Sequence, residues 1–310
     1  MINHLNRLDI LAYGRKILGR KLANIIKNTV AEVSFKLGIA PTPDTKRPNC
    51  ISALMRVKNE EWWIEPSILS IKDLVEEYVI VDGSDEDRTP EIIEEVKARE
   101  GLNIKHVIDY DQDIVAVSNR GLRLTSCRWV LRWDGDFIAK DEMPSYIKTF
   151  IEGLDRNRYY NIYWPHICLD GDLYHQDLRN PLHVEHWLVS YSPGTKFVWN
   201  RGVEYLVTPY YHKRIELLTP LSFHLRTVKP PKRLLHRKYW SELLRNNLLG
   251  SIDIKEYIIM RIKEEYNTDD IDKAAEIYFN EFLKRLHPYN KEKYGDLPSI
   301  LKNYSRGVSG

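Results

Sequence analysis

The sequence predicts an α/β fold: a mixed, mostly parallel central sheet with flanking helices. From Cys50 to Asp136, short apolar runs alternate with helical segments, which is typical of right-handed βαβ crossovers. The first, second and fourth of these runs end in acidic or amide-containing turns, and ligands of such sheets collect at the carboxyl ends of the strands. With 310 residues, of which 43% are hydrophobic, the chain can bury a sizeable core.

Four strands and three helices are expected in this region. The strands are Ile51–Val57, Glu77–Val81, Asn103–Ile108 and Arg128–Trp133. The helices are Trp62–Ile71, one that opens at Thr89, and Ile114–Thr125. The Thr89-Pro90-Glu91 sequence supplies an N-cap, a proline at the first helical position and an acid in the first turn, which together favour a helix start.

After Asp136 the pattern is less regular. A helix is expected over Met143–Leu154, followed by the aromatic-rich strands Arg158–Ile167, His186–Ser190, Lys196–Trp199 and Leu217–His224. Beyond Pro230-Pro231 the chain is mostly helical and charged, with the clearer helices at Ile252–Ile262 and Ile271–Leu286. The predicted regions are therefore a basic segment with its linker (1–47), an α/β catalytic domain (48–230) and a helical C-terminal extension (231–310).

The N-terminal segment predicts an amphipathic helix. Leucine, isoleucine and valine recur at helical spacing over residues 3–38, although Gly14 and Gly19 are expected to mark breaks. Residues 1–47 hold nine Lys or Arg against three acids, a net charge of +6 in a chain whose total is +2. Such a helix can lie on an anionic membrane, where each nearby basic residue adds ~1 kcal/mol. The alternative, which the pattern favours, is that it packs on the catalytic domain or on a second subunit.

The composition argues against nucleic-acid-binding, membrane-spanning and disulfide-stabilised classes of protein. The near-neutral total charge gives no indication of nucleic-acid binding, and no apolar run approaches the about 20 residues that a spanning helix needs. Cys50, Cys127 and Cys168 lack metal-ligand spacing, so we expect free thiols in a reducing cytosol rather than a disulfide scaffold. The expected location is the cytoplasm or the cytoplasmic face of a membrane.

The stretch Trp133-Asp134-Gly135-Asp136 carries the chemistry. Alternate residues of an extended backbone share a face, so Asp134 and Asp136 can point at one spot, and Gly135 allows a ligand to approach closely. Two adjacent carboxylates need a cation, and their hard oxygens suit Mg²⁺ or Mn²⁺. The alternative is an ordinary acidic turn. Its place after the fourth strand, at the same sheet edge as Lys58-Asn59 and Asp82-Gly83, favours the metal site.

The order of these motifs resembles the family 2 glycosyltransferases with the GT-A fold. The segments ISALMRVKNEEWWIEPSILSI and EEYVIVDGSDEDRTPEII resemble the family's first two strands with their KNEE-like and DGS turns. The segment AVSNRGLRLTSCRWVLRWDGDF resembles the helix, strand and D-x-D that follow. The match spans about residues 50–140.

The resemblance implies a nucleotide-diphosphate-sugar donor of the UDP or GDP type and Mn²⁺ or Mg²⁺. Asp82 matches the acid that accepts a hydrogen bond from the nucleotide base, and Asp134 and Asp136 match the metal pair. Lys58 and Asn119, in the matching turn and helix, are expected to contact the donor. The chain departs from the family at Val81, where a second acid is frequent.

A second departure is Ser118, where the family often has Arg; the neighbouring Arg120 is a candidate substitute. Downstream, the stretch from Phe223 to Arg233 resembles a tail element in which a strand-end histidine, here His224, joins the metal. The predicted phosphate contacts of this element are Arg226, Lys229 and Arg233, since guanidinium groups bind phosphate well. The alternative for His224 is a structural histidine at a strand end. His212, His175 and His183 are weaker metal candidates, and His166 and His186 are expected to be structural.

The general base is expected between the D-x-D and His224. Glu204, in a loop-like stretch after a strand, is the first candidate, and Glu185 and Asp172 are rivals. Trp164 and Trp199 are candidates for stacking on the acceptor, although buried aromatic residues more often fill the core.

The function predicted from these features is metal-dependent transfer of a sugar to a glycan, lipid-linked or glycoconjugate acceptor, with inversion. Two alternatives stay open. A D-x-D phosphohydrolase would need its nucleophile at the end of the first strand, where the chain has Lys58-Asn59. A catalytically silent, membrane-associated scaffold is allowed by the departures at Val81 and Ser118.

Overall fold

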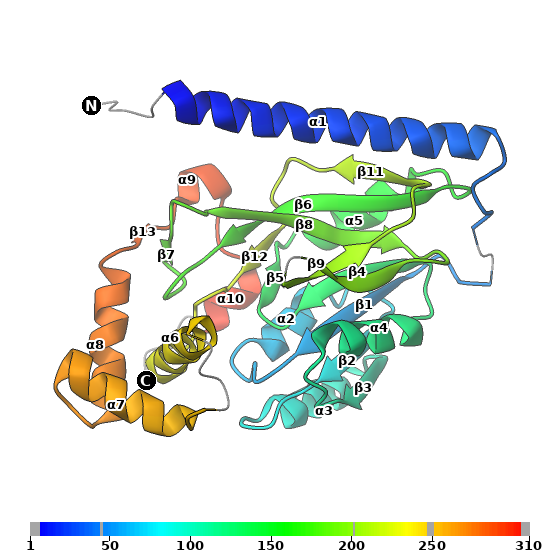
Figure 1. Cartoon of the computed structure of the whole chain (residues 1–310). Coiled ribbons are helices and arrows are strands. Elements are labelled where there is room, and N and C mark those ends of the chain that lie inside the picture. The colour runs from blue at the N-terminus through cyan, green and yellow to red at the C-terminus, as the bar shows by residue number, and fades with distance from the viewer. Residues whose placement is uncertain (1–6, 44–45, 201, 247–250, 305–310) are drawn as a thin grey trace.

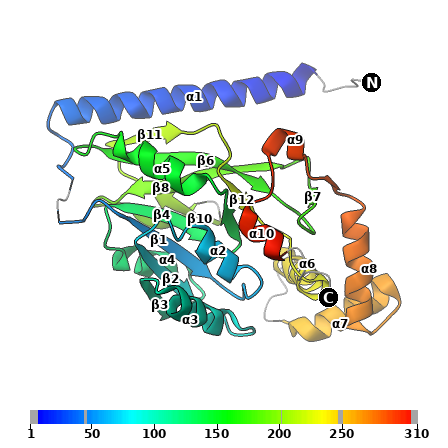
Figure 2. The same cartoon turned by 180° about the vertical axis from the view of Figure 1, so that it is seen from behind.

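The computed structural model describes residues 7–43, 46–200, 202–246 and 251–304, except for the side chains of residues 7–21, 185, 186 and 303. It confirms a mixed α/β architecture with a curled, mostly parallel central sheet and flanking helices (Figures 1 and 2).

The strands of the large sheet are β1 (Ile51–Val57), β2 (Glu77–Asp82), β3 (Ile104–Ile108), β4 (Trp129–Asp134), β5 (Phe137–Ala139), β6 (Tyr159–Cys168), β8 (Leu182–Ser190), β11 (His212–Glu216) and β12 (Ser222–His224). Outside it, β9 (Lys196–Asn200) pairs with β10 (Val203–Val207), and β7 (His175–Gln176) pairs with β13 (His287–Pro288). The helices are α1 (Arg7–Lys36), α2 (Ile64–Ser70), α3 (Thr89–Glu100), α4 (Ile114–Leu124), α5 (Met143–Glu152), α6 (Pro231–Arg245), α7 (Ile254–Tyr266), α8 (Ile271–Leu283), α9 (Lys291–Tyr294) and α10 (Ser299–Tyr304).

The sheet has the order β3-β2-β1-β4-β8-β6-β12-β5, with β11 paired to β6. The four strands predicted first run parallel to one another, and β8 is antiparallel to both β4 and β6. β12 lies between β6 and β5, so the chain returns late to the strand that follows the D-x-D. This return places His224 beside Phe137 in register.

Two expectations about elements were wrong. The helix α1 runs from Arg7 to Lys36 without a break at Gly14 or Gly19. The predicted strand Leu217–His224 is a strand only over Ser222–His224, because Pro220 has no N–H for a ladder and Leu218 lies exposed in the preceding turn. The residues before that turn form β11 instead, and the hairpin partner β10 was not predicted.

The two faces of the sheet bury alternate residues of each strand. Met55 and Ile80 pack on the face that α2, α3 and α5 cover. Leu54 and Val81 pack on the opposite face, under α4 and the β9–β10 hairpin. The near-continuous apolar strands of the sequence thus reflect burial on both sides, as in other parallel sheets.

The C-terminal region forms a small helical unit that returns to the catalytic body. α6, α7 and α8 pack around Leu235, Tyr239 and Ile262. The chain then comes back to the sheet, where Tyr294 and Leu301 pack with residues of the catalytic domain. Among the described helices, none combines the length and apolar character that crossing a membrane requires.

The cysteines correct an expectation. Cys50 and Cys127 form a disulfide whose Cα atoms are 5.0 Å apart, joining the chain just before β1 to the chain just before β4, and Cys168 is a buried free thiol. The prediction of free thiols at Cys50 and Cys127 was wrong because spacing along the chain does not reveal that β1 and β4 are neighbours. The disulfide removes the ground for expecting a reducing cytosol, and the cytoplasmic location stays a prediction.

Removal of this disulfide is expected to lower the free energy of unfolding. The bond links residues 77 positions apart, and closing a long loop restricts the unfolded chain, with a typical contribution of about 2–4 kcal/mol. Denaturant titration of the wild type with and without reductant measures the difference. The matched control is Cys50→Ala/Cys127→Ala, whose midpoint should not respond to reductant; an equal midpoint for reduced and oxidised wild type would contradict the prediction.

Candidate functional site

The carboxyl ends of β1, β2 and β4 meet, as the sequence predicted. Val57 is in register with Asp82, and Arg56 with Asp134. Asn59 joins the turn after β1 to the turn after β2 by hydrogen bonds, and we call these two the clasped turns. Its backbone N–H donates to Ser84 Oγ (2.8 Å), and its side-chain oxygen accepts from the backbone N–H of Asp85 (3.0 Å). Asn59 adopts a positive φ of 55°, a conformation that asparagine tolerates better than most residues.

Gly135 lets the D-x-D turn close onto this clasp. A Cβ at this position would lie 3.1 Å from Val57 Cγ1 and 3.2 Å from Glu60 Cγ, so a larger residue would push the turn away. The turn is also tied to the late strand, because the backbone N–H of Leu225 donates to the carbonyl oxygen of Asp136 (2.9 Å). The end of β1, the turn after it and the chain after β12 therefore fix the position of the D-x-D turn.

Asp136 lies in a cluster of charged and titratable groups. His224 Nε2 is 3.6 Å from Asp136 Oδ1, and Lys229 Nζ is 3.6 Å from Asp136 Oδ2. The buried Lys229 also donates to both carboxylate oxygens of Glu60, at 2.5 and 2.8 Å. The cluster thus holds two carboxylates around one ammonium group.

Burial and charge give the two carboxylates, Asp136 and Glu60, different pKa values. Burial raises the pKa of Asp136, but the positive charges of His224, Lys229 and Arg237 outweigh it, so the pKa of Asp136 lies well below its ordinary value. Burial and then the charge of Asp136 raise the pKa of Glu60 to about 7, against the opposing effect of Lys229. Asp136 is therefore the ionised member of the pair and the better ligand for a cation.

His224 faces Asp136 through Nε2 and can offer this nitrogen to a cation. Its Nδ1, at another edge of the ring, is buried and has no hydrogen-bond partner within the described part of the chain. An imidazole beside an ionised carboxylate fits a divalent metal such as Mn²⁺. The full predicted set is not gathered tightly, however. Over the described residues, ligand atoms of three such side chains come within 4.8 Å of one another only at Cys50, Glu76 and Cys127, where the two sulfurs form the disulfide.

Asp134 belongs to a second, adjoining network that contains Glu204. Arg132 Nη2 is 3.9 Å from Asp134 Oδ2 and 3.6 Å from Glu204 Oε2, and Arg56 Nη2 is 3.2 Å from the same glutamate oxygen. Glu204 Oε1 is buried without a hydrogen-bond partner among the described residues. The β9–β10 hairpin therefore brings the predicted base to Arg56 and Arg132, and Arg132 connects it to Asp134 of the D-x-D.

Asp82 is fully buried at the end of β2. Its Oδ1 accepts from the backbone N–H of Ser84 (2.8 Å), and its Oδ2 lies 3.1 Å from Nε2 of His106, whose Nδ1 lies 2.8 Å from Glu94. Burial lowers the pKa of His106, but the hydrogen bonds to Asp82 and Glu94 outweigh it, so the pKa of His106 is raised. His106 therefore holds Asp82 in place.

Comparison with known proteins decides the family. The family described as glycosyl transferase family 2 matches residues 52–210, just over half of the chain. The chain belongs to this family. No curated protein matches significantly.

Solved structures similar to the chain include two from S. aureus TarS and one from Mycobacterium tuberculosis. TarS 1-349 is 22% identical, with a TM-score of 0.33, over 38% of this chain and 36% of that one. TarS 1-349 in complex with UDP-GlcNAc is 16% identical, with a TM-score of 0.42, over 76% and 72%. Glucosyl-3-phosphoglycerate synthase with Mn²⁺, uridine diphosphate and glucosyl-3-phosphoglycerate is 21% identical, with a TM-score of 0.30, over 37% and 44%. The first of these alignments thus spans little more than a third of either chain.

The basic residues predicted to contact the donor in this family 2 chain each have an acidic partner. Lys58 pairs with Asp85 (3.4 Å), Arg233 with Glu86 (3.2 Å) and Lys229 with Glu60. Arg226 makes two hydrogen bonds to the buried Asp170 (3.0 and 2.8 Å), which also accepts from Thr227, so Arg226 fastens the chain after β12. Lys58, Lys229 and Arg233 are the three that lie at the clasped turns.

Asn119 and Arg120 lie side by side on α4, the helix that the family motif predicted, but their side chains contact different parts of the structure. Both polar atoms of the Asn119 side chain bond to the backbone of Phe197, which ties α4 to the β9–β10 hairpin. Arg120 pairs with Asp109 (2.6 Å) and Asp111 (2.9 Å), and the backbone N–H of Asp109 donates to the carbonyl oxygen of Asp82. Of the two, Arg120 is next to the Asp82 turn.

The remaining candidates lie apart from this cluster or within the core. Asp172 contacts His175 (2.7 Å) in the turn before β7, and the side chain of Glu185 lies outside the described residues. Trp164 is fully buried and donates to Ser222, so its predicted contact with an acceptor was wrong, whereas Trp199 is half exposed.

His166 is buried among aromatic rings, as its predicted structural role requires, and His212 contacts Ser192 in the interior. His183 lies near His224, with ring centroids 6.4 Å apart. The side chain of His186 lies outside the described residues.

Sequence reasoning missed Glu60, Arg56, Arg132 and His106. Arg56 and Arg132 carried a usable signal, because each is a charged residue inside an otherwise apolar strand that ends at the site. His106 carried a weaker one within β3. Glu60 stood in the KNEE-like turn, but nothing in its spacing indicated that Lys229 would reach it.

His106→Gln is expected to lower stability in a pH-dependent way. The folded-state pKa of His106 is raised, so its contribution is fully present below the unfolded value of about 6.5 and is lost as pH rises through the folded value. The variant should lose about 1–2 kcal/mol at acidic pH and less at alkaline pH. Denaturation across this range measures the loss; a constant difference at every pH would contradict the prediction.

Proposed function

We propose that this family 2 member transfers a sugar from a nucleoside-diphosphate donor of the UDP or GDP type, with a divalent metal ion and with inversion. The observation that carries the proposal is the meeting of Asp134-Gly135-Asp136 with the ends of β1 and β2, within the region that matches the family. Transfer requires a stabilised diphosphate leaving group and a base for the acceptor hydroxyl.

Asp136 and His224, with Asp134, would hold Mn²⁺ or Mg²⁺. The bound ion would neutralise charge on the departing diphosphate. Lys229 serves the same end from the protein side. It stands 3.6 Å from Asp136 and is bonded to Glu60, so a donor phosphate would compete with Glu60 for its ammonium group.

Asp82 is proposed to recognise the nucleoside. A carboxylate has about four lone-pair sites, and Asp82 uses two of them for Ser84 and His106. Because the side chain is fully buried, a base N–H reaches it only if the surrounding turns open. Lys58 and Arg233, which are more exposed, are proposed to meet the phosphates.

Glu204 is proposed as the general base. Arg56 and Arg132 hold its Oε2, which keeps the carboxylate oriented, while Oε1 is left to accept a proton. Both arginines are positioning residues for the base, and Arg132 also links it to Asp134. In an inverting transfer, this carboxylate would remove the proton from the acceptor hydroxyl as the bond to the donor sugar forms.

A lipid-linked acceptor is the alternative that the surroundings favour. A cavity of about 520 Å³ lies between the clasped turns and helices α6–α8. Its lining is apolar at Trp62, Leu235, Ile258, Ile259 and Ile271, and polar at Asn59 and at three acids and three bases, which are Glu61, Glu86, Asp87, Lys232, Arg233 and Lys255. Such a combination suits a molecule with an apolar chain and a polar head.

Asp136→Asn is expected to weaken metal-dependent nucleotide binding by at least about tenfold, because it removes the ionised ligand at the centre of the cluster. Isothermal titration of UDP and GDP, each with and without Mn²⁺, measures the effect. Asp172→Asn is the matched control, since its carboxylate lies in the turn before β7. Wild-type protein that binds neither nucleotide in the presence of metal would sink the donor proposal.

Glu204→Gln is expected to lower kcat by about 10²–10⁴-fold while the affinity for the nucleotide stays within a few fold, because loss of the base removes only the proton transfer. Single-turnover transfer, measured once a donor and acceptor are found by screening, tests this split. Retained turnover in the variant would assign the base elsewhere. A parallel loss of nucleotide affinity would instead indicate that Glu204 supports the donor site.

A further inference from the structure

Helix α1 lies along β11 at the outside of the body (Figures 1 and 2). Two asparagines fasten it there. Asn24 Nδ2 donates to Glu216 Oε1 (2.8 Å), and Asn28 exchanges hydrogen bonds with the backbone of Arg214 (2.9 and 2.7 Å). The inward face of the helix is therefore polar where it meets the edge of β11.

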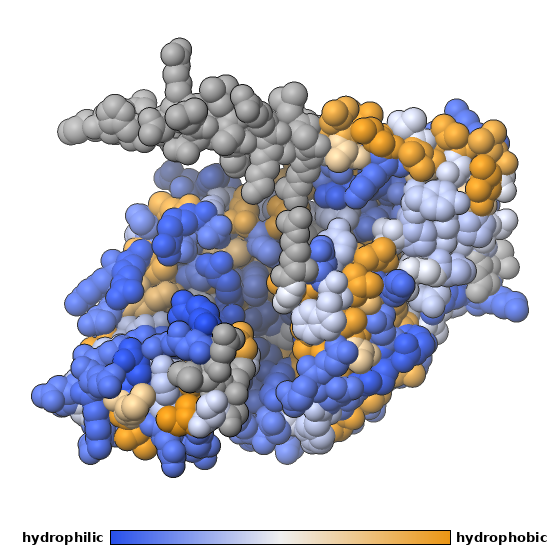
Figure 3. All heavy atoms as spheres, viewed as in Figure 1, coloured by the Kyte–Doolittle hydropathy of each residue, from blue (hydrophilic) through white to orange (hydrophobic). Residues whose placement is uncertain are grey.

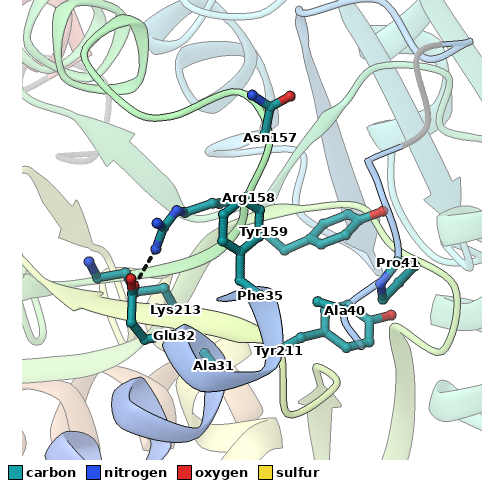
Figure 4. A pocket seen from close by; sticks show the side chains of 10 residues that line it. All are labelled: Ala31, Glu32, Phe35, Ala40, Pro41, Asn157, Arg158, Tyr159, Tyr211 and Lys213. Atoms are coloured by element: carbon teal, nitrogen blue, oxygen red, sulfur yellow. Dashed lines mark hydrogen bonds and ion pairs between the residues drawn. The ribbon is translucent and has the colours of Figure 1, made fainter. Parts of the chain in front are cut away.

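One turn further on, α1 contacts the start of β6 (Figure 4). Glu32 forms an ion pair with Arg158, whose guanidinium carbon also lies 4.3 Å from the ring centroid of Phe35. Ala31 is 4% exposed against the same surface. Asn24, Asn28, Ala31 and Phe35 follow one another at spacings of four and three, so a single helical face makes the contact.

Over residues 22–37, the face opposite these contacts is apolar and exposed. Leu22, Ile26, Val33 and Leu37 are exposed by 59%, 56%, 47% and 66%, and they repeat at spacings of four and seven. Ile25 and Val30 border this stripe and are also exposed. Figure 3 shows the hydrophobic residues along the outer side of the described half of the helix. The helix thus shows the reverse of the usual arrangement, in which the apolar face is buried.

We propose that this outer stripe binds the surface of an anionic lipid bilayer, so that α1 lies in the interface and holds the body against it. The positive charge of the N-terminal segment favours an anionic lipid surface. Residues 1–47 carry a net charge of +6, and Lys27 and Lys36 fall on either side of the stripe by helical periodicity. An apolar stripe flanked by basic residues matches acyl chains beneath anionic headgroups.

A second copy of the chain is the less favourable occupant. Pairing two α1 helices through their stripes would bring two segments of charge +6 against each other. Helix α1 is also straight and lies on the outside of the molecule (Figure 1), so a flat surface can reach the whole described length of the stripe. The proposal does not depend on the sugar transfer proposed above.

Co-sedimentation of the full chain with vesicles tests the proposal. The protein is expected to pellet with phosphatidylcholine vesicles that contain phosphatidylglycerol and to remain largely in solution with phosphatidylcholine alone, and added salt should weaken the binding. Ile26→Glu/Val33→Glu should bind the anionic vesicles at least about tenfold more weakly, because it places two charges in the stripe. Both residues are exposed, so the melting temperature should change little.

Leu244→Glu is the matched control, since this exposed leucine lies on α6, and its vesicle binding should equal that of the wild type. Equal binding of the stripe variant and the wild type would overturn the proposal, as would equal binding to neutral and anionic vesicles. Light scattering without lipid gives the oligomeric state. A wild-type dimer that becomes monomeric in the stripe variant would assign the stripe to a second copy and overturn the lipid assignment.

Discussion

Mutual repulsion among carboxylates at the strand ends is the constraint around which this site is built. Glu60, Asp134 and Asp136 come from two turns that the fold presses together, and Gly135 makes the approach possible. Like charges held so close are stable only with cations between them. Lys229 meets Glu60 and Asp136, while Arg132 meets Asp134, so each acid has a positive partner.

The topology explains how distant residues reach these acids. β12 inserts between β5 and β6, and this late return carries His224 and then Lys229 to the turn that left β4 much earlier. The β9–β10 hairpin, tied to α4 by Asn119, delivers Glu204 from the other side. The site is thus closed by two excursions of the chain after the parallel core is complete. Both the proposed metal ligand and the proposed base depend on those excursions.

This order of assembly also explains what could be predicted from the sequence. The parallel strands and the turns after β1, β2 and β4 follow from local patterns, because buried strands and strand-end turns have local signals. The partners of those turns do not, since Lys229 reaches Glu60 over 169 positions and Glu204 reaches Arg56 over 148. The disulfide could not be predicted for the same reason, because only the pairing of β1 with β4 brings Cys50 near Cys127. The prediction of breaks at Gly14 and Gly19 was wrong because α1 contacts β11. These contacts are absent from the local sequence pattern, and they add to the stability of the helix.

The pairing of the basic side chains at the site with acids affects how strongly a donor can bind. Lys58, Lys229 and Arg233 are each occupied by an acid, so a diphosphate that binds them replaces one anion with another. Such an exchange gives less net electrostatic energy than binding to free cations would. Under the proposed function, the selectivity of the site for a charged donor would then come largely from the metal ion proposed to bind at Asp136, a carboxylate whose pKa is lowered. The raised pKa of Glu60, about 7, fits the same account, because a glutamate that loses Lys229 to a phosphate can take up a proton instead of remaining as an unpaired buried charge.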